Sequence, residues 1–375
     1  MRILYFSREY STHDHRFLSA LEKTGHQIYY LRLERRGHAL EDRPVPAAVE
    51  QVQWAGGAGP ARLQDGLRLL IDLKQVLKKI KPDLVHAGPI QSSAFLVALT
   101  GYKPLVSMSW GYDLLIDAQR SKAWTWVTRY TLQHSAVLVG DCQTIRQTAV
   151  SYGMSEDHIV TFPWGVDLCH FLPGPEEGIN QPPGLRSRLG WGEEAFVLLS
   201  TRSWESIYGV EVLAEAFVQA ARQHPELRLM MLGNGSLAVR LRQIFMRGEV
   251  IDQVVFPGQV NQSDLPKYYR SADLYLSASH SDGTSISMLE ALACGCPVLL
   301  SDIPGNLEWI TPGEQGWFFR DGNIQSLAEA ITKAVENRKE LAGMRQSARR
   351  LAEQRADWEK NFNELLKAYR MAGVN

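Results

Sequence analysis

The sequence predicts an α/β protein with two doubly wound domains, each a parallel sheet covered by helices on both faces. Short apolar strands alternate with amphipathic helices in both halves of the chain. A stretch rich in proline and glycine, residues 173–192, has no periodicity and reads as a linker. The length of 375 residues suits two domains of roughly 100–200 residues each. We therefore expect one domain over 1–172 and a second over 173–355.

The first half contains strand patterns separated by helical ones. The helix over 61–80 is favoured by apolar side chains at helical spacing, including Leu67, Leu70 and Ile71, and Lys81-Pro82 ends it. The expected strands are 2–7, 27–33, 83–87, 104–109, 136–139 and 158–162, and the expected helices are 14–23, 61–80, 91–100, 116–134 and 143–152.

The second half repeats the alternation after the linker. The expected strands are 195–201, 227–232, 254–256, 273–279, 298–301 and 316–319, and the expected helices are 210–223, 236–247, 262–270, 285–294, 324–335, 338–353 and 357–371. Ligands of such sheets bind at the carboxyl ends of the strands, so the residues that follow each strand are the candidates for a site.

Composition limits the class of protein. A formal net charge of -1 argues against a general nucleic-acid binder, which normally carries a basic excess. We expect neither a signal peptide nor a membrane span, since the apolar runs are short. Of the four cysteines only Cys294 and Cys296 are close, and no second Cys/His cluster accompanies them. We therefore expect no metal site, and reduced thiols in a cytoplasmic protein.

The stretch 274–310 is the most informative part of the chain. It reads as a strand, a polar loop, a helix and a second strand, with Asp282 in the loop and Glu290 about two turns into the helix. Backbone amides at such a loop and helix N-terminus suit a phosphate group. A carboxylate at Glu290 can accept hydrogen bonds from ribose hydroxyls. The plain alternative is an ordinary strand-to-helix crossover.

Arg202 closes the first strand of the second half, where its planar guanidinium fork can bind diphosphate oxygens. The alternative is an arginine paired with a surface acid such as Glu205. After the next strand, Gly233-Asn234-Gly235 permits positive φ and close approach of the backbone to a ligand, although such turns are also common connectors.

The segment 282–298 resembles the donor-binding signature of the retaining glycosyltransferases of the GT-B fold, glycosyltransferase family 4, which includes bacterial mannosyl- and glucosyltransferases. Asp282 stands where a glutamate is usual, and the residues that fit the rest of the pattern are Glu290, Ala291, Gly295, Pro297 and Val298. The resemblance covers nearly the whole chain. It implies two Rossmann-like domains facing a central cleft, an acceptor domain followed by a donor domain, with a final helix, 356–375, crossing back to the first.

The resemblance also implies roles in the donor domain. Arg202 and Gly209 match a Gly-Arg-x…Lys-Gly motif whose cations neutralise the leaving diphosphate, but Tyr208 replaces the lysine. Asp282 would hold the transferred sugar and Glu290 the ribose. The residues implied around the donor are Gly283, Thr284, Ser285, Ile286, Ser287, Gly233 and Asn234, with Gly258 and Val260 near the nucleobase.

In the first domain, residues 109–113 match the family's His-Gly-x-Asp position, with Trp110 in place of the histidine, followed by Gly111. Tryptophan can stack on a sugar face and donate one N–H. Asp113 either hydrogen-bonds the acceptor or holds the loop. His86 lies at the end of its expected strand and His15 (or its neighbour His13) follows the first strand; each would contact the acceptor or else pack or cap.

The segment 120–134 combines basic and aromatic side chains on one expected helix. Such a helix can rest on anionic lipid at the inner face of a membrane. Alternatively it packs on its own sheet and exposes a solvated basic face, which is the interpretation we favour.

Taken together, the sequence predicts a retaining, metal-independent hexosyltransferase without a cofactor. It would use a nucleotide-diphosphate sugar, would act on a hydroxyl of a polysaccharide, glycolipid or small molecule, and would not bind nucleic acid. Arg202, Asp282 and Asp113 are the candidate catalytic residues. The alternatives are a sugar-nucleotide 2-epimerase, a non-catalytic nucleotide-sugar-binding partner and, least favoured, a glycoside hydrolase, whose two carboxylates must flank one glycosidic bond.

Overall fold

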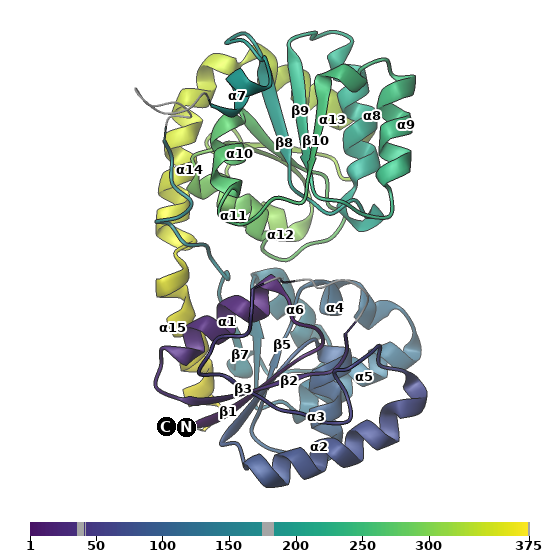
Figure 1. Ribbon diagram of the computed structural model, residues 1–375, viewed down its shortest axis with the longest axis vertical. Helices are drawn as coiled ribbons and strands as arrows, with labels where there is room; N and C mark the ends of the chain where they lie inside the picture. Colours follow the sequence, from purple (N-terminus) through teal and green to yellow (C-terminus); the bar gives the residue numbers. More distant parts are fainter. Residues whose placement is uncertain (36–40, 42, 175–183, 374–375) are drawn as a thin grey trace. The chain divides into compact units, whose positions relative to one another are not determined.

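The computed structural model describes residues 1–35, 41, 43–174 and 184–373. The chain divides into two compact units. The first comprises Met1–Phe162 together with Phe362–Asn375, and the second comprises Pro163–Asn361. Each unit contains one parallel sheet with helices around it (Figure 1).

The first unit has a seven-stranded parallel sheet in the order β3-β2-β1-β4-β5-β6-β7. The strands are β1 (Arg2–Ser7), β2 (Gln27–Arg32), β3 (Glu50–Gln51), β4 (Leu84–Ala87), β5 (Leu105–Met108), β6 (Val137–Gly140) and β7 (Ile159–Thr161). The helices are α1 (Thr12–Glu22), α2 (Gly66–Ile80), α3 (Phe95–Thr100), α4 (Tyr112–Leu115), α5 (Lys122–His134), α6 (Gln143–Ser151) and the greater part of α15 (Trp358–Met371).

Alternating side chains of the central strands bury both faces of this sheet. Leu4 and Phe6 of β1 pack in one core cluster with α2 and α3. Tyr5, between them, contacts the ring of His86, which in turn contacts Tyr369 of α15. Because successive strand residues point to opposite faces, helices from both ends of the chain are required to cover the sheet.

The second unit has a six-stranded parallel sheet in the order β10-β9-β8-β11-β12-β13. The strands are β8 (Phe196–Ser200), β9 (Leu227–Leu232), β10 (Val254–Gly258), β11 (Leu274–Ser277), β12 (Val298–Ser301) and β13 (Gly316–Phe319). The helices are α7 (Leu185–Arg188), α8 (Val210–Ala221), α9 (Ala238–Arg247), α10 (Leu265–Ser271), α11 (Ile286–Ala293), α12 (Pro304–Leu307), α13 (Ile324–Glu336) and α14 (Leu341–Arg355).

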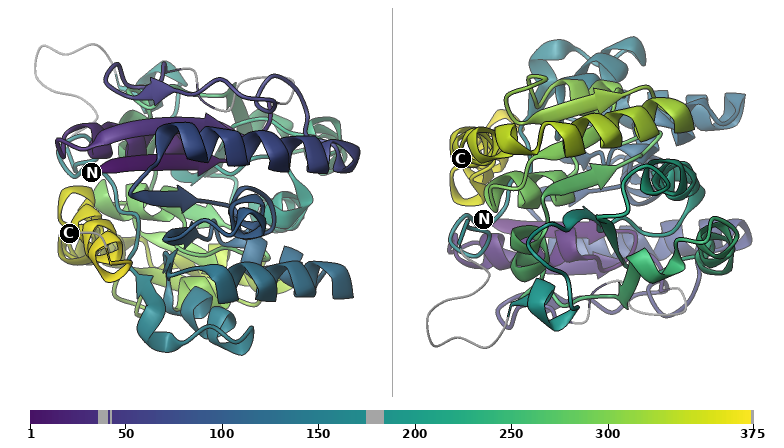
Figure 2. Two further views of the ribbon diagram at one scale, coloured as in Figure 1. Left: turned by 90° about the horizontal axis from the view of Figure 1, so that it is seen from below. Right: turned by 90° about the horizontal axis from the view of Figure 1, so that it is seen from above.

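The alternation along β8 separates the two cores of this unit. Phe196 and Leu198 join α8, α9 and α13 in one apolar cluster, whereas Val197 and Leu199 join α10, α11 and α14 in another. The two views of Figure 2 show the strands of each sheet side by side with helices packed along them. The predicted doubly wound architecture is confirmed in both units.

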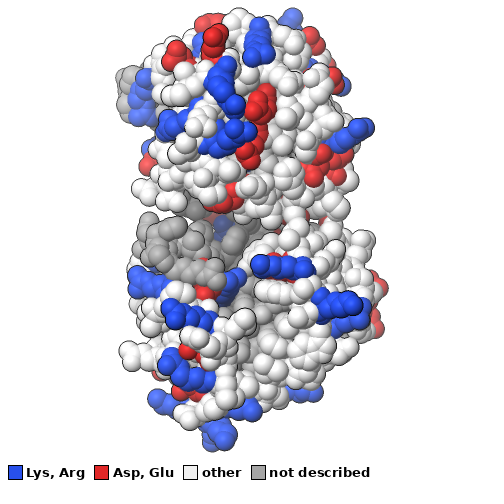
Figure 3. All heavy atoms as spheres, turned by 90° about the vertical axis from the view of Figure 1, so that its right-hand side faces the viewer, with Lys and Arg blue, Asp and Glu red and all other residues white. Residues whose placement is uncertain are grey.

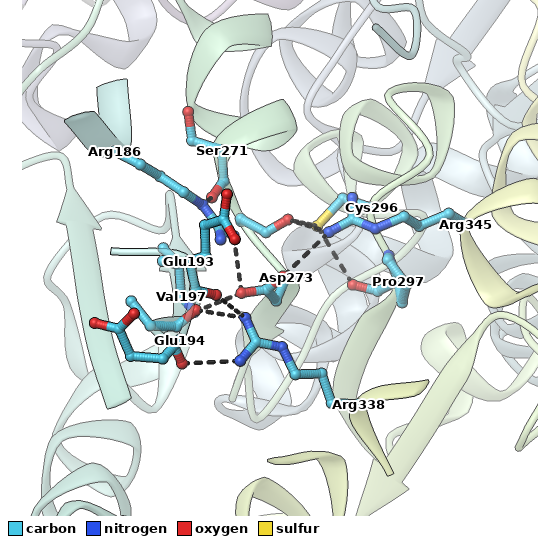
Figure 4. A network of polar contacts seen from close by, with 12 residues as sticks. Arg186, Glu193, Glu194, Val197, Ser271, Asp273, Cys296, Pro297, Arg338 and Arg345 are labelled. Atoms are coloured by element: carbon cyan, nitrogen blue, oxygen red, sulfur yellow. Dashed lines mark hydrogen bonds and ion pairs between the residues drawn. The ribbon is translucent and has the colours of Figure 1, made fainter. Parts of the chain in front are cut away.

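The amino end of β11 is fixed by a buried carboxylate, away from the strand ends at which ligands bind. Asp273 accepts a hydrogen bond from the amide of Val197 at 2.8 Å and pairs with Arg186 at 2.8 Å and Arg345 at 3.4 Å (Figure 4). Two guanidinium groups and one amide compensate for the burial of this charge. The network leaves the other end of β11 to carry the functional loop.

Several expected elements differ from those observed. The helix expected over 116–134 is divided into α4, a 3-10 turn at Asp117–Gln119 and α5, and Ser121 caps α5 by accepting from the amide of Trp124. Within the expected linker 173–192, residues 175–183 lie outside the described ones and α7 forms a short helix. The short edge strand β3 was not predicted.

The return of the final helix is confirmed, because Phe362–Asn375 belongs to the first unit. The expected domain boundary at residue 172 differs from the division observed after Phe162. Residues 163–172 belong to the second unit: the amide of Val166 donates to the carbonyl of Ala356 at 2.7 Å, and Arg349 donates to the carbonyl of Phe171 at 2.8 Å.

Candidate functional site

Arg202 lies just beyond the carboxyl end of β8 and is bound to the loop and helix that follow β11. Its Nη2 donates to Asp282 Oδ2 at 2.8 Å, and its Nη1 donates to Ser285 Oγ at 3.0 Å and Ser287 Oγ at 3.2 Å. Its side chain is only 13% exposed. The structure thus brings together four residues that were predicted from separate parts of the sequence.

The electrostatics of this cluster favour a permanent cation. Burial on its own would lower the pKa of Arg202, but the surroundings, and first among them the negative charge of Asp282, raise that pKa above its usual value. The ring of Tyr208, which replaces the motif's lysine, lies 4.2 Å from the guanidinium carbon, as in a cation–π contact. The alternative partner Glu205 binds the amide and hydroxyl of Ser236 instead.

The guanidinium also retains an unused donor. Its Nε is buried and has no hydrogen-bond partner among the residues that the structure describes. A buried N–H without a partner costs about 1–3 kcal/mol, and the loop would have to move before an anion could reach this donor. Arg202 therefore brings the charge expected of a residue that binds an anion.

Helix α11 begins against this cation. Ser285 is its N-cap and accepts from the amide of Met288 at 3.4 Å. The hydroxyl of Thr284 accepts from the indole N–H of Trp309 at 3.3 Å. Gly305 fits closely against the loop, because a Cβ there would lie 2.5 Å from the carbonyl oxygens of Asp282 and Gly283. The loop 282–285 is therefore held from several sides, with the positive end of the helix dipole at Ile286 and Ser287.

Glu290 is buried on α11 and its carboxylate is already hydrogen-bonded. Oε2 accepts from the hydroxyl of Tyr269 at 2.8 Å, and Oε1 accepts from Gln262 Nε2 at 3.3 Å. Burial, and next the charge of Glu290, raise the pKa of Tyr269 well above its usual value, so this phenol stays protonated and donates. Tyr269 also approaches Thr201 Oγ1 at 3.2 Å, which links the carboxylate to the strand end that carries Arg202.

Two buried tyrosines of this site were missed by sequence reasoning. Tyr269 positions Glu290, and Tyr275 donates to Ser287 Oγ at 2.7 Å. Tyr275 lies inside an apolar strand pattern, where an aromatic residue reads as core and its hydroxyl gives no signal.

Glycines shape the neighbouring loops. Gly209 has φ of +59°, and a Cβ there would lie 1.9 Å from the carbonyl oxygen of Ala278, at the start of the loop after β11. Gly233, with φ of +96°, donates its amide to the carbonyl of Gly258 at 2.7 Å. The carbonyl of Asn234 accepts from the amide of Trp204 at 3.0 Å. The turns after β8, β9 and β10 are thus tied together, with Val260 packed on the core beneath.

In the first unit, Asp113 holds the loop after β5. Its carboxylate accepts from the amides of Ile90, Trp110 and Leu114, each at 3.0 Å, and from Ser109 Oγ at 2.6 Å. Burial raises its pKa to about 6 against the lowering effect of these donors. Of the two roles left open, the structure shows the second, because the carboxylate is fully buried and bound within the loop.

Trp110 and the two neighbouring histidines lie at the same edge of the sheet. The Trp110 ring lies 5.3 Å from that of His13 and 6.1 Å from that of Phe17. Gly111 has φ of +89°, which turns the chain into α4. His15 Nδ1 is 2.8 Å from the hydroxyl of Tyr10, and burial lowers the pKa of His15.

The prediction that His86 stands at an open strand end is wrong. It lies within β4, is 1% exposed and has Nδ1 2.7 Å from the hydroxyl of Tyr369 in α15. Burial lowers its pKa to about 3, so the ring is neutral. The histidine was placed at the end of its strand because the covering helix comes from the far end of the chain, which local patterns do not reveal.

Helix α5 packs within the first unit by Thr128, Thr131 and Leu132 and exposes Trp126. Trp126 stacks on Tyr130, with ring centroids 5.3 Å apart. Within the described part of the chain, no helix is long and apolar enough to cross a membrane. The same residues contain no cluster of three His, Cys, Asp or Glu side chains suited to a metal ion.

Comparisons with known proteins agree with this geometry. Residues 11–169 match the family model described as Glycosyltransferase Family 4, and residues 184–351 match Glycosyl transferases group 1. A D-inositol 3-phosphate glycosyltransferase of Geodermatophilus obscurus is 30% identical over 238 residues, which cover 60% of this chain and 50% of that protein. An alpha-monoglucosyldiacylglycerol synthase of Streptococcus pneumoniae is 31% identical over 144 residues, 38% of this chain and 32% of that protein. The chain thus spans about half or less of these relatives.

Solved structures share the whole fold. HepE of Anabaena in complex with UDP has a TM-score of 0.79 at 19% identity, over 99% of this chain and 100% of that one. A glycosyltransferase of Rickettsia africae has a TM-score of 0.78 at 17% identity, over 100% of this chain and 99% of that one. The paired Rossmann-like units define a protein of the GT-B fold. With a family model matching each half, the chain belongs to glycosyltransferase family 4.

Proposed function

We propose that the protein transfers a hexosyl group, with retention of anomeric configuration, from a nucleotide-diphosphate sugar to a hydroxyl acceptor. The observation that carries this proposal is the cluster in which Asp282, Ser285 and Ser287 hold the guanidinium of Arg202 at the start of α11. Family membership and the name of the inositol phosphate relative support it.

The cluster suits a departing diphosphate. Negative charge grows on the leaving oxygens as the bond to the anomeric carbon breaks, and fixed donors stabilise that charge without having to reorganise. Arg202 supplies a full positive charge at every working pH, and the amides at Ser285–Ser287 add the partial charge of a helix N-terminus. Tyr208 adds no charge where the motif has lysine, so Arg202 carries a larger share of the neutralisation. We propose that no metal ion is needed.

The chemistry that retains configuration balances within the two substrates. The bond from the anomeric carbon to the diphosphate oxygen breaks, and the acceptor oxygen forms its bond on the same face of the sugar. The acceptor proton passes to a phosphate oxygen of the leaving group. The protein then mainly positions the reactants and stabilises the leaving charge.

The two carboxylates, Asp282 and Glu290, would bind different parts of the donor, the sugar and the nucleotide. Asp282 would accept from hydroxyls of the transferred sugar while it holds Arg202. Glu290 would exchange its 3.3 Å contact with Gln262 for a ribose hydroxyl and keep the shorter bond to Tyr269. In the first unit, Trp110 would stack on the acceptor, and Asp113 would act as a positioning residue for that loop.

A ligand screen followed by a transfer assay tests the proposal. Thermal shifts with UDP, GDP, ADP and their sugars should identify one stabilising base, since ligand at 100 times its Kd adds about 2.7 kcal/mol. Transfer from the matching sugar nucleotide should then give an α-linked product from an α-linked donor, seen by NMR, and should persist with a chelator present. Conversion of the donor sugar without an acceptor would instead indicate an epimerase. Binding of the sugar nucleotide without turnover would indicate a non-catalytic partner.

A further inference from the structure

The first unit contains an apolar cavity that the proposed chemistry does not use. Its volume is about 490 Å³, within the range of about 300–1,000 Å³ for small-molecule sites. Helices α2 and α3 supply most of its leucines, and one further leucine follows β2. The apolar side chains in the wall include Leu33, Leu67, Leu70, Phe95, Leu96 and Leu99.

One part of the wall is polar and belongs to the loops that follow the strands. Arg8, directly after β1, donates to Glu34 at 2.5 Å, and both line the cavity. Tyr112 and Asp117, from the segment after β5, also line it. Tyr112 is adjacent to Gly111 and Asp113 in the loop assigned above to the acceptor. The cavity therefore joins the carboxyl edge of the sheet, where such domains bind ligands.

The entrance exposes large apolar side chains. Leu63 is fully exposed, Leu67 is 72% exposed and Tyr112 is 38% exposed, and all three line the cavity. Large apolar groups clustered at a groove usually mark a binding site for an apolar partner. Figure 3 shows that uncharged atoms dominate the face of the first unit in view, with more basic than acidic side chains among them.

We propose that this cavity binds the hydrocarbon chain of an amphipathic ligand with a hydroxyl-bearing head; on the function proposed above, that ligand is the acceptor. A bare sugar could bond to the polar side chains of the wall but would leave its leucines and Phe95 unmatched; the polar groups are those of Arg8, Glu34, Arg62, Gln91, Ser92, Tyr112 and Asp117. The hydrocarbon chain of an amphipathic ligand would instead be buried against the leucines of α2 and α3. Its hydroxyl-bearing head would then lie at the edge of the sheet beside Tyr112. A hollow of this volume accepts a single chain more readily than the broad surface of another protein.

Alkyl β-glucosides of graded length test the chain directly. Binding of the pentyl to nonyl compounds to the full-length protein is measured by calorimetry below their aggregation concentrations. Each added methylene that is buried should raise the affinity about fourfold, until the cavity is full. A flat dependence on chain length overturns the proposal.

A pair of variants on α2 supplies a matched control. Leu67 lines the cavity, whereas Ile71, one turn further and 52% exposed, does not. Leu67→Ser should weaken nonyl glucoside about fivefold, since about half of a leucine contact is lost, and Ile71→Ser should leave it unchanged. Both positions are on the surface, so both variants should fold. If both variants weaken nonyl glucoside equally and also lose binding to anionic vesicles equally, the proposed role of the cavity is refuted. The helix would then bind a lipid surface instead.

These measurements separate this inference from the proposed function. Calorimetry of the glucosides requires no turnover. If the protein binds them with an affinity that grows with chain length but binds no nucleotide sugar, the inference about the cavity stands and the proposed glycosyl transfer is refuted. If the protein transfers sugar to glucose and to nonyl glucoside with equal kcat/KM, the proposed glycosyl transfer stands and the role of the cavity in binding the acceptor is refuted.

Discussion

Replacing Gly209 with alanine should displace the loop that carries Asp282. Gly209 has φ of +59°, which costs a non-glycine residue about 1–2 kcal/mol. The added Cβ would lie 1.9 Å from the carbonyl oxygen of Ala278, about 1.5 Å inside the 3.4 Å at which ordinary contact begins. Both atoms belong to the backbone or are fixed to it, so one chain segment must move.

The two effects add to a measurable loss of stability. Forced overpacking typically costs about 1–3 kcal/mol, which with the backbone cost gives about 3 kcal/mol for Gly209→Ala. Gly190 is the matched control in the same unit: its φ is +70° and no atom lies within 4 Å of the position that a Cβ would take, so Gly190→Ala should show the backbone cost alone, about 1–2 kcal/mol.

Differential scanning calorimetry can follow the transition of the second unit. For a unit of this size about 1 kcal/mol shifts Tm by roughly 2–4 °C, so Gly209→Ala should lower it by about 6–12 °C and Gly190→Ala by much less. Donor affinity should fall only in Gly209→Ala, because Ala278 leads directly into the loop. Equal shifts in the two variants, with unchanged donor affinity, would refute the close contact.

Three further predictions concern single side chains. Arg202→Ala should lower kcat about 10²–10³-fold and donor affinity less, because its charge acts mainly on the leaving group; equal losses in steady-state kcat and in calorimetric affinity would assign it to ground-state binding. Glu290→Ala should weaken nucleotide binding in calorimetry by about tenfold or more, whereas Tyr269→Phe, which removes one hydrogen bond of 2.8 Å, should weaken it less; unchanged affinity in Glu290→Ala would exclude the ribose contact. His86 has a folded pKa of about 3, below its usual 6.5, so its unfolded form takes up a proton first as the pH falls. His86 thus contributes stability above about pH 6.5 that is lost between there and pH 3, by up to about 1.4 kcal/mol per pH unit. The free energy of unfolding of His86→Gln, measured by chemical unfolding across this range, should depend less steeply on pH than that of the unmodified protein, by up to one proton. An identical pH dependence in the two proteins would contradict the burial of a neutral ring.

The periodicity of the sequence was sufficient to predict the two sheets and most of their helices. The strands are short and apolar, and the residues that follow them are polar, so the strand ends and the Asp282–Glu290 segment could be located. Arg202 was placed correctly beyond its strand for the same reason. Its partner could not be chosen, since Glu205 and Asp282 are equally plausible carboxylates until the fold brings strands β8 and β11 side by side.

The features that the sequence did not predict depend on contacts between residues that are far apart in the chain or on single polar atoms. His86 follows two apolar residues at the expected strand end, and only the packing of α15 shows that it is buried. Tyr269 and Tyr275 act through a single hydroxyl each, which an apolar pattern hides. The cavity is lined from several separate parts of the first unit, so the sequence shows Leu67, Leu70 and Ile71 as a plain helical stripe, although Leu67 and Leu70 line the cavity and Ile71 does not.

Helix α15 has a consequence for how the protein is made. It emerges from the ribosome after the whole of the second unit, yet Tyr369 packs on His86, which in turn packs on Tyr5 in the amino-terminal sheet. The second unit is continuous in sequence, whereas the first lacks one wall until α15 has been synthesised. We therefore expect the second unit to complete its fold before the first, the reverse of the usual vectorial order in which the leading domain matures first. A nascent chain stalled before Phe362 should hold a complete second unit and a first unit that is still open on the side that α15 covers.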